Sequence, residues 1–482
     1  MRSRQAKCIL ALVVLAAALG RAPAQCKQSF NKDPGWDGRN NRIARELEPR
    51  NVRQDFGYSP LTQHAGGKPG EIGGVIQPAA EPAYYAKPIP VKTLNDRLSA
   101  SGKLLVGRGG GNMLFGFFNN KTLNEWRTPN AIVVRINGRG EFYHAHVEFT
   151  SQKWRAAAGI IGRYDPVADR NQPREFPFGA VHKWSLEYDP AGNNGSGSIV
   201  FTLDGDKALI DLTPGLRRDG ATFNHFGLLN VIKSYDDAGE VWMDDLVING
   251  EAQDFSRDPK WKGLRNRKTY ETRGVRPRFD FGFSPTHYAG GAAPGELGGV
   301  VYRGDCRYPE RMACYGDRLK TLTLKRPLRA SGKVVLRRGV TDSTTAIGFY
   351  HSTHSMAVSD SQQFTTPRDF LGVYIEGPSR EGFYFYPVYR NHLNDPSSGY
   401  PDNPPHILPD GAPHNWALVY DATAAHGNGR ITVTLDGRAT SLDLAPGVKT
   451  SGAAFDRFGI ITTWIDGNAQ EVYFDDLEYT RR

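Results

Sequence analysis

Five side chains between residues 374 and 390 are of the types that bind sugars. Tyr374 and Glu376 alternate along one predicted strand, and Tyr384, Tyr386 and Arg390 alternate along the next. Because successive side chains of a strand point to opposite faces, each set shares a face. Aromatic rings stack on sugar C–H groups, while Arg and carboxylate groups form charged hydrogen bonds with hydroxyls or carboxylates. The pattern predicts a carbohydrate-binding groove in which Glu376 is also a candidate catalytic group; alternatively, half of these tyrosines belong to the core.

A second group of side chains could bind a metal or transfer protons. His144, His146 and Glu148 share one face of a predicted strand within residues 142–148. Imidazole and carboxylate groups at this spacing suit a transition metal or acid–base catalysis. The alternative interpretation is a polar strand face turned to solvent. These three residues are the second set of catalytic candidates.

The elements that position these groups belong to one unit that the chain contains twice. Asp55-Phe-Gly-Tyr-Ser-Pro60 returns as Asp280-Phe-Gly-Phe-Ser-Pro285, and further motifs return in the same order. Such self-similarity indicates a duplicated domain. We assign residues 29–250 to the first copy and residues 254–482 to the second, and we expect the first and last strands of each copy to pair. The copies diverge at the second set of candidates, because the expected counterparts of those three residues are Phe385, Pro387 and Tyr389.

Each copy consists of short predicted strands joined by turn sequences. Segments 131–136, 198–203 and 239–244 are alternating or β-branched, and Gly, Asn and Asp residues separate the strands. This pattern suits a two-sheet antiparallel sandwich or jelly roll. The sequence therefore predicts an all-β chain of two tandem β-sandwich domains, with Trp184 and Trp416 in their cores.

The ends of both copies resemble the closing strand of concanavalin A-like lectin/glucanase domains. These segments are Val241-Trp-Met-Asp-Asp-Leu246 and Val472-Tyr-Phe-Asp-Asp-Leu477, and the Phe-x-x-Asp-Pro-x-Trp segments that begin at Phe30 and Phe255 are similar as well. The resemblance spans both copies and implies tandem jelly-roll domains. The superfamily holds lectins, binding modules, hydrolases and lyases, so the fold alone selects no activity. The Glu-x-Asp-x-Glu strand of its laminarinase-like members does not occur in this sequence.

The resemblance also implies a structural calcium ion in each copy. Asp244 and Asp475 stand where similar jelly rolls place a calcium ligand on the last strand. Asp33 would supply the second carboxylate beside Asp244, and Asp258 would supply it beside Asp475, with backbone oxygens completing the ligands. The alternative is that these residues are exposed aspartates or turn caps.

The first residues and the cysteines indicate export. Residues 1–24 combine basic residues, an apolar run and an Ala-Pro-Ala site, as in a secretory signal peptide. Its removal lowers the formal charge from +9 to +5, which hardly argues for nucleic acid. We expect a disulfide between Cys306 and Cys314, with Cys26 unpaired, in a secreted or periplasmic protein. No later stretch is long and apolar enough to span a membrane, and we expect a monomer.

These observations favour a secreted polysaccharide-binding protein. The alternative is a glycoside hydrolase or polysaccharide lyase that acts on an extracellular glycan. A purely structural module of the cell surface is the third class. The binding partner expected in the first two cases is a polysaccharide or oligosaccharide, and the sequence does not name the glycan.

Overall fold

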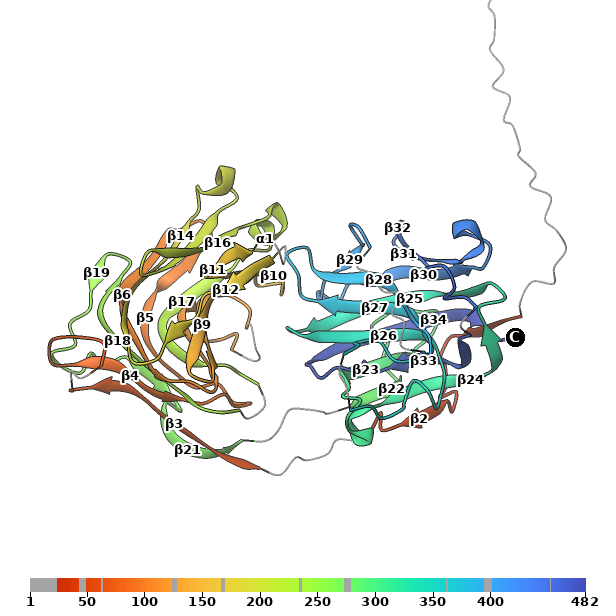
Figure 1. Ribbon diagram of the computed structural model, residues 1–482, viewed down its shortest axis with the longest axis horizontal. Coiled ribbons are helices and arrows are strands. Elements are labelled where there is room, and N and C mark those ends of the chain that lie inside the picture. Colours follow the sequence, from red (N-terminus) through yellow and green to blue (C-terminus); the bar gives the residue numbers. More distant parts are fainter. Residues whose placement is uncertain are drawn as a thin grey trace, which may run out of the picture.

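The computed structural model is an all-β protein of two sandwiches (Figure 1). It describes residues 24–42, 49–61, 64–123, 128–165, 170–233, 236–272, 279–360, 363–393, 401–450 and 452–482. The predicted signal peptide, residues 1–24, lies outside these residues except for Ala24. The prediction of two antiparallel β-sandwiches is confirmed.

The first sandwich has a back sheet and a front sheet. The back sheet contains β3 (Arg50–Ser59), β4 (Glu71–Ile76), β6 (Leu98–Arg108), β14 (Val181–Asp189), β15 (Ser198–Leu203), β16 (Asp206–Asp211), β18 (Gly239–Ile248), β19 (Glu251–Ala252) and β21 (Arg267–Thr272). Their order is β16-β15-β14-β6-β18-β4-β3-β21, with β19 beside β18.

The front sheet of the first sandwich contains β5 (Tyr84–Thr93), β7 (Asn112–Phe118), β8 (Ala131–Arg139), β9 (Phe142–Thr150), β10 (Ala156–Ile160), β13 (Phe176–Pro177), β17 (Thr222–Asn230) and β20 (Lys262–Leu264). The order is β10-β9-β8-β7-β17-β5-β20, with β13 beside β9. A separate pair is formed by β11 (Gly162–Asp165) and β12 (Arg170–Pro173), and the connections include a 3-10 turn (Asn193–Gly195) and the short helix α1 (Pro214–Asp219).

The second sandwich repeats this plan. Its back sheet contains β1 (Gln25–Gln28), β22 (Asp280–Ser284), β23 (Glu296–Tyr302), β25 (Leu328–Gly339), β30 (His414–Asp421), β31 (Arg430–Leu435), β32 (Arg438–Asp443) and β34 (Ala469–Thr480). Its front sheet contains β2 (Asp37–Arg39), β24 (Cys314–Thr323), β26 (Ser343–Tyr350), β27 (Phe370–Gly377), β28 (Phe383–Arg390), β29 (His406–Ile407) and β33 (Ala454–Ile461). The strand orders are β22-β23-β34-β25-β30-β31-β32, with β1 beside β34, and β2-β24-β33-β26-β27-β28-β29. Two 3-10 turns, Pro309–Arg311 and Ala425–Gly427, lie in its connections.

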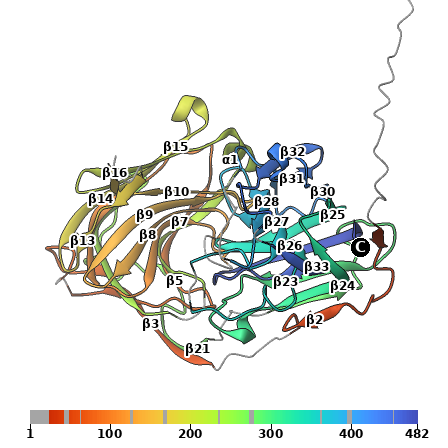
Figure 2. The ribbon, with the colours of Figure 1, turned by 45° about the vertical axis from the view of Figure 1, so that its right-hand side comes forward.

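The two sandwiches are closed by segments from different parts of the chain. We call residues 25–42 the N-terminal strap and residues 254–272 the middle strap. The N-terminal strap joins the second sandwich, where β1 pairs with β34 and β2 pairs with β24. The middle strap stays with the first sandwich, where β20 pairs with β5 and β21 pairs with β3. In Figures 1 and 2, β2 accordingly lies at the second sandwich and β21 runs beneath the first.

Equivalent residues anchor the two straps in equivalent places. Asn266 exchanges hydrogen bonds with Phe56, because the Phe56 N–H donates to its backbone oxygen at 2.9 Å and its side chain donates to the Phe56 oxygen at 2.8 Å. Asn41 makes the same two bonds with Phe281, at 2.9 and 2.6 Å. The straps are thus the same structural piece, delivered to opposite sandwiches.

This arrangement divides the chain differently from the sequence repeat. Residues 50–272 form the first sandwich as one continuous stretch, although the repeat places a boundary at residues 250–254. The second sandwich combines residues 279–482 with the N-terminal strap. The reason is the turn after β18, which returns the chain as β19 along its own sandwich and carries the middle strap with it. Because β1 is the counterpart of β19, the second sandwich obtains this strand from the chain start.

Each sandwich has its own apolar core between its two sheets. Trp184 and Trp416 lie in the two cores, as predicted. Phe30 of the N-terminal strap is completely buried in the second core, and Phe255 and Trp261 of the middle strap are buried in the first. The straps therefore contribute core residues as well as strands.

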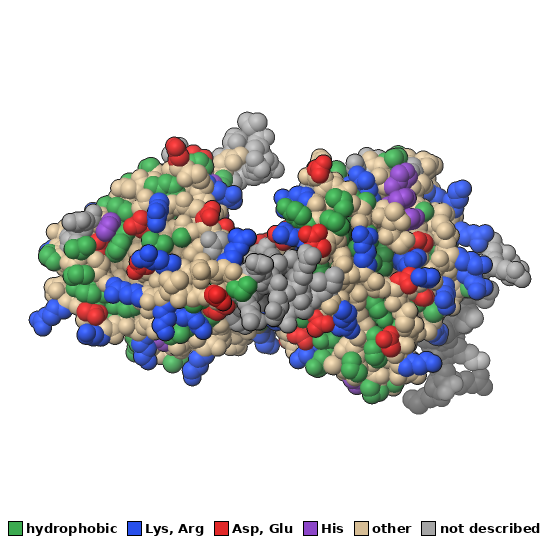
Figure 3. Space-filling view, turned by 90° about the horizontal axis from the view of Figure 1, so that it is seen from below, with side chains coloured by type: hydrophobic (Ala, Val, Ile, Leu, Met, Phe, Trp, Pro, Cys, Tyr) green, Lys and Arg blue, Asp and Glu red, His purple; other side chains and the backbone are tan. Residues whose placement is uncertain are grey.

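The surface and the connections between the sandwiches are polar. On the face shown in Figure 3, basic and acidic side chains are interspersed over both sandwiches. The turn between β27 and β28 contacts the first sandwich, since the Ala156 N–H donates to the Ser379 oxygen and Arg380 donates to the Asp211 oxygen, both at 3.1 Å. No helix in the described ranges has the length and hydropathy to cross a lipid bilayer.

Candidate functional site

The five predicted sugar-binding residues lie on the outer face of the second front sheet, the face turned away from the back sheet. Tyr374 pairs with Tyr386 and Glu376 pairs with Tyr384 across β27 and β28. The intervening side chains, which include Val373, Ile375, Phe385 and Tyr389, pack into the core. The strand parity expected from the sequence is therefore correct from Tyr384 to Arg390, and no bulge interrupts it.

The two sets of candidates occupy the same positions in the two sandwiches. Gly116 of β7 pairs with Val133 of β8, which pairs with Glu148 of β9. In the second sandwich the matching Gly348 of β26 pairs with Gly372 of β27, which pairs with Val388 of β28. Glu148 is therefore equivalent to Val388. By the same count, His144 and His146 are equivalent to Tyr384 and Tyr386. The expected match to Phe385, Pro387 and Tyr389 was displaced by one residue, because loops of unequal length precede the strands.

Three of the five residues are buried, which contradicts the expectation of one accessible groove. Tyr374 and Tyr386 are 2% and 4% exposed, and Arg390 is 1% exposed. Tyr374 and Tyr386 belong to an apolar cluster on the outer face that also contains Cys306, Met312, Met356 and Trp464, and Arg390 lies against Trp464. The physical reason is that the connections around the sheet fold over this face and exclude water from it.

Arg390 has a structural role under this cover. Its guanidinium lies 4.3 Å from the Phe364 ring centroid and 4.6 Å from that of Trp464. Its Nη1 donates to the Thr366 oxygen at 2.7 Å. Burial lowers the pKa of Arg390 to about 10. The side chain is thus held between two aromatic rings and does not face a glycan.

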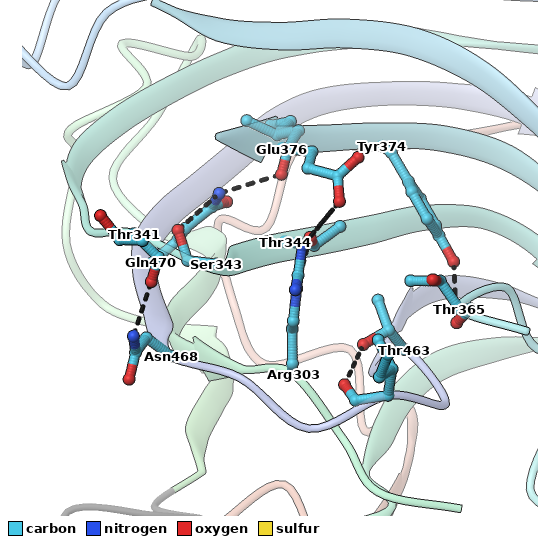
Figure 4. A network of polar contacts seen from close by, with 12 residues as sticks. Arg303, Thr341, Ser343, Thr344, Thr365, Tyr374, Glu376, Thr463, Asn468 and Gln470 are labelled. Carbon is cyan, nitrogen blue, oxygen red and sulfur yellow. Dashed lines mark hydrogen bonds and ion pairs between the residues drawn. The ribbon is translucent and has the colours of Figure 1, made fainter. Parts of the chain in front are cut away.

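Glu376 is held in an ion pair at the edge of the cluster (Figure 4). Arg303, from the loop after β23, places Nη2 2.6 Å from Glu376 Oε1 and donates from Nε to Thr344 at 2.8 Å. The Tyr386 hydroxyl donates to the other carboxylate oxygen. Both carboxylate oxygens are therefore engaged by neighbouring side chains, which gives Glu376 a structural role here.

Tyr384, by contrast, lines an open cavity. The cavity measures about 500 Å³ and lies where β29 pairs with the start of β28. Its other lining residues are Glu381, Pro401, Asp402, Asn403, Pro404 and His406. The Tyr384 and His406 rings lie 4.9 Å apart at 48°. An aromatic plane beside carboxylate, amide and imidazole groups can stack on a sugar ring and bind its hydroxyls.

His406 is held neutral at physiological pH. Burial, and then the charges of Arg438 and Arg155, lower its pKa to about 4. Its Nε2 atom is buried and has no hydrogen-bond partner among the described residues. A neutral imidazole can donate from one ring nitrogen and accept at the other, so it suits a hydroxyl group.

The first sandwich carries a different polar group at the matching place. Glu148 Oε1 pairs with Arg135 Nε at 2.7 Å, and Arg135 donates to Asn112 at 3.0 Å. His144 and His146 are half-buried beside each other, and burial lowers the pKa of His144. Among the residues that the structure describes, no three His, Cys, Asp or Glu side chains converge in a way that could hold a metal. The three residues share a face as predicted, but Glu148 is engaged by Arg135.

The straps place two of the aspartates proposed for calcium in the sandwich opposite to the expected one. Asp258 lies in the first sandwich, where the Tyr85 hydroxyl approaches it at 3.5 Å, and Asp33 lies in the second, where the Tyr315 hydroxyl donates to it at 3.2 Å. The expected pairs Asp33/Asp244 and Asp258/Asp475 are therefore wrong, because each strap is delivered to the opposite sandwich. Calcium itself stays a prediction, now centred on Asp244 and Asp475.

Asp244 and Asp475 are buried on the last strands, each beside a buried glutamate. Glu71 accepts hydrogen bonds from the Ala65 N–H and from His64, and Glu296 accepts them from the N–H groups of Tyr288 and Ala289. The two glutamates thus order the Gly-rich loops. Burial, followed by neighbouring carboxylates, raises the pKa of Asp244 and of Asp475.

The expected disulfide is not formed. Cys306 and Cys314 are buried thiols that form no disulfide with each other, and Cys26 is a half-buried thiol. The Cys306 thiol donates to the Ser359 oxygen at 3.6 Å, and Cys314 lies on β24 in the same apolar cluster. The two thiols pack as small apolar groups under the cover instead of bonding to each other.

Sequence reasoning missed most of the cavity. Glu381 lies in the turn between β27 and β28, and His406 belongs to the two-residue strand β29. Two residues give no periodicity, so β29 had no sequence signal. The prolines at 401, 404 and 405 marked a loop near Tyr384, but only the pairing of Tyr384 with His406 brings that loop to the site.

No protein-family model and no curated protein sequence matches the chain. Some solved structures show a weak likeness to the chain. Domains LG4-5 of the mouse laminin α1 chain share 11% identity over 88% of this chain and 93% of theirs, with a TM-score of 0.24. The carbohydrate recognition domain of Emp47p shares 11% identity over 42% of this chain and 88% of its own length, with a TM-score of 0.28. A polysaccharide lyase of family 18 shares 9% identity over 47% of this chain and 93% of its own length, with a TM-score of 0.23.

These structures have concanavalin A-like, lectin-type folds, which is the class that the terminal strands of this chain resemble. The likeness concerns the fold class alone. The description of the site therefore depends on the residues of this chain.

Proposed function

We propose that this chain is a secreted carbohydrate-binding protein whose site is the cavity beside Tyr384. The observation that carries the proposal is the composition of that cavity, which combines an aromatic ring with two carboxylates, an amide and a neutral imidazole. These are the groups that stack on a sugar ring and bind its hydroxyls. The ligand class is a polysaccharide or oligosaccharide.

The volume of the cavity fits this ligand class. Small-molecule sites in proteins range from about 300 to 1,000 Å³, and the cavity of about 500 Å³ could hold one or two sugar rings.

The test is a binding screen of the mature protein against neutral and anionic polysaccharides. For any glycan that binds, Tyr384→Ala should weaken affinity about tenfold, since truncating a central aromatic often costs more than 1 kcal/mol. The matched control is Tyr288→Ala, because Tyr288 is a surface tyrosine (39% exposed) that lies beside Tyr473 of the back sheet. Equal affinity in Tyr384→Ala and the unmodified protein would overturn the proposal.

The same screen examines the enzymatic alternative. Glu381 and Asp402 both line the cavity, so product release should be measured with every glycan that binds. Loss of product formation in both Glu381→Gln and Asp402→Asn, with binding retained, would move the assignment to a hydrolase or lyase. Absence of product with tight binding would leave the chain a binding protein.

Export belongs to the proposal as well, and it is supported by the signal-peptide pattern of residues 1–24. Sequencing the N-terminus of the protein recovered outside the cytoplasm should give a start at or near residue 25. Recovery of the uncut chain in the cytoplasm would contradict export.

A further inference from the structure

A cluster of histidines surrounds a buried carboxylate at one end of the second front sheet. Asp369 stands before β27 and is 1% exposed. His354, from the loop after β26, places Nδ1 2.5 Å from Asp369 Oδ2, and His392, just after β28, places Nδ1 3.7 Å from Asp369 Oδ1. His351 stacks on His354 with ring centroids 4.0 Å apart. This cluster is separate from the cavity beside Tyr384.

The first sandwich shows what this sheet end looks like without the cluster. Ala131 and Phe370 occupy equivalent places in the strand pairing of the two front sheets. Counting from them, the positions of His351, Asp369 and His392 correspond in the first sandwich to Asn119, Asn130 and Gln152. The Asn130 side chain accepts a hydrogen bond from the Thr222 N–H at 2.9 Å. Neutral amides therefore suffice to close this end of the fold, and the titratable groups of the second sandwich are an addition.

Among the described residues, hydrogen bonds satisfy only one of the two oxygens of the buried Asp369 carboxylate. Oδ2 faces His354, but Oδ1 is buried and has no hydrogen-bond partner among the described residues. Buried charges are ordinarily paired or bound to a metal, because removing them from water is costly. Oδ1 lies toward His392, whose side chain is 40% exposed and can reach solvent.

We propose that Asp369 Oδ1 and His392 Nδ1 bind one divalent transition-metal ion of the zinc class. Zinc bonds of 2.0–2.2 Å at tetrahedral or wider angles separate two ligand atoms by about 3.4 to 3.7 Å, and these two atoms are 3.7 Å apart. His354 donates from Nδ1 to the other carboxylate oxygen and thereby orients it, as the outer partners of metal ligands do. Water would have to complete the coordination, because the described residues provide no convergent group of three ligands.

The neighbouring groups are compatible with this role. His351 accepts the backbone N–H groups of Thr353 and His354 at Nδ1, at 3.2 and 3.3 Å, so this nitrogen is occupied and the ring supports His354. Asp456 is engaged by Ser352 through two hydrogen bonds of 2.7 Å. Imidazole and carboxylate together select zinc-class metals, whereas calcium prefers oxygen ligands alone.

The experiment is calorimetric titration of the mature, metal-free protein with ZnCl2. One zinc ion should bind, and Asp369→Asn and His392→Gln should each weaken it tenfold or more. Each variant introduces the residue that the first sandwich has at the equivalent position. Asn also tolerates the left-handed backbone of Asp369 (φ 49°), as Asn130 shows at φ 61°. His414→Gln is the matched control, because His414 and Asp436 form another His–carboxylate pair (2.6 Å) in the same sandwich.

Two outcomes would overturn the proposal. The first is no zinc binding by the unmodified protein, and the second is equal zinc affinity in the two site variants and the control. The d–d spectrum of bound Co2+ provides a second measurement, which should be lost in His392→Gln. CaCl2 in place of ZnCl2 should give no heat that depends on Asp369.

Discussion

At the scale of single residues, Asp475 is a carboxylate that the fold keeps away from water. It is completely buried on β34, and its Oδ1 accepts the Asp476 N–H at 2.7 Å. Its Oδ2 contacts Gly291, where a side chain would have no room, and has no hydrogen-bond partner among the described residues. Burial, then the charges of Asp476 and Glu296, raise the pKa of Asp475 to about 6. At neutral pH the ionised form therefore destabilises the fold unless a cation is bound.

This leads to a prediction for Asp475→Asn. Between pH 3.8 and about 6 the folded state holds the Asp475 proton more tightly than the unfolded chain does. The free energy of unfolding therefore falls as the pH rises through this range, and the full loss is reached above pH 6. Each unit of pKa corresponds to about 1.4 kcal/mol, so the variant should be about 3 kcal/mol more stable at pH 7 without calcium. Thermal unfolding measured from pH 3 to pH 8 should show this difference vanish below pH 4.

Calcium provides the contrast for the same variant. If Asp475 binds calcium, added calcium should raise the melting temperature of the unmodified protein and not that of Asp475→Asn. Asp443→Asn is the control, because Asp443 lies exposed beside Arg430 on the same sandwich. If Asp475→Asn is less stable than the unmodified protein at pH 7 in metal-free buffer, the ionised Asp475 carboxylate does not destabilise the fold and the prediction is wrong.

At the scale of elements, the N-terminal strap is held by a core residue, by strand pairing and by ion pairs. Phe30 is fully buried and packs against Trp36 with ring centroids 5.2 Å apart. Asp37 accepts Arg318 Nε at 2.5 Å and lies 3.0 Å from Arg457. These contacts join it to two strands that come far later in the chain, so the strap should remain bound without a covalent link.

We therefore predict that cutting the chain after the strap does not release it. A protease site inserted between Arg42 and Pro49 should yield two pieces that elute together in gel filtration and separate in denaturant. Phe30→Ala should release the strap after cutting, because truncating a buried Phe costs about 3 to 5 kcal/mol. Phe255→Ala, the equivalent change in the middle strap, should leave the cut N-terminal strap bound. Separation of the pieces in native buffer without any substitution would show that the strap is held weakly.

The elements also show which parts of the site could be derived from sequence. Strand faces follow from alternation, so the shared face of Tyr374, Tyr384 and Arg390 was predictable. Their accessibility was not, because the cover comes from loop residues such as Met356 and Trp464, which have no period. The fold class was predictable from the repeat and the strand pattern. The exchange of straps was not, because both straps carry the same motif and dock at equivalent places of the two sandwiches.

At the scale of the whole molecule, the chain consists of one continuous sandwich and one composite sandwich. Residues 50–272 contain every strand of the first, whereas the second requires residues from both ends of the chain. Polar contacts such as that between Ala156 and Ser379 connect the two. The first sandwich should therefore be the independent folding unit, in contrast to the boundary that the repeat suggests.

Two fragments test this division. Residues 50–272 should give a cooperative thermal transition and native near-UV circular dichroism. Residues 254–482 should not, because this fragment lacks β1, β2 and Phe30 and carries a middle strap with no partner sandwich. Cooperative unfolding of 254–482 at the stability of the full chain would show that the N-terminal strap is dispensable.

The meeting of the chain ends has a consequence for engineering. In the mature chain, Gln25 on β1 pairs with Thr480 on β34, although 455 positions separate the two residues in the sequence. A short peptide could therefore splice the last residue to the first, and new ends could be opened between Arg42 and Pro49. The resulting circular permutant would list the first sandwich and then the second in unbroken succession, with every native contact kept. In the natural order, by contrast, translation at roughly 5–20 residues per second leaves the strap without its partner strand for roughly 20 to 90 seconds, with Phe30 and Trp36 uncovered throughout.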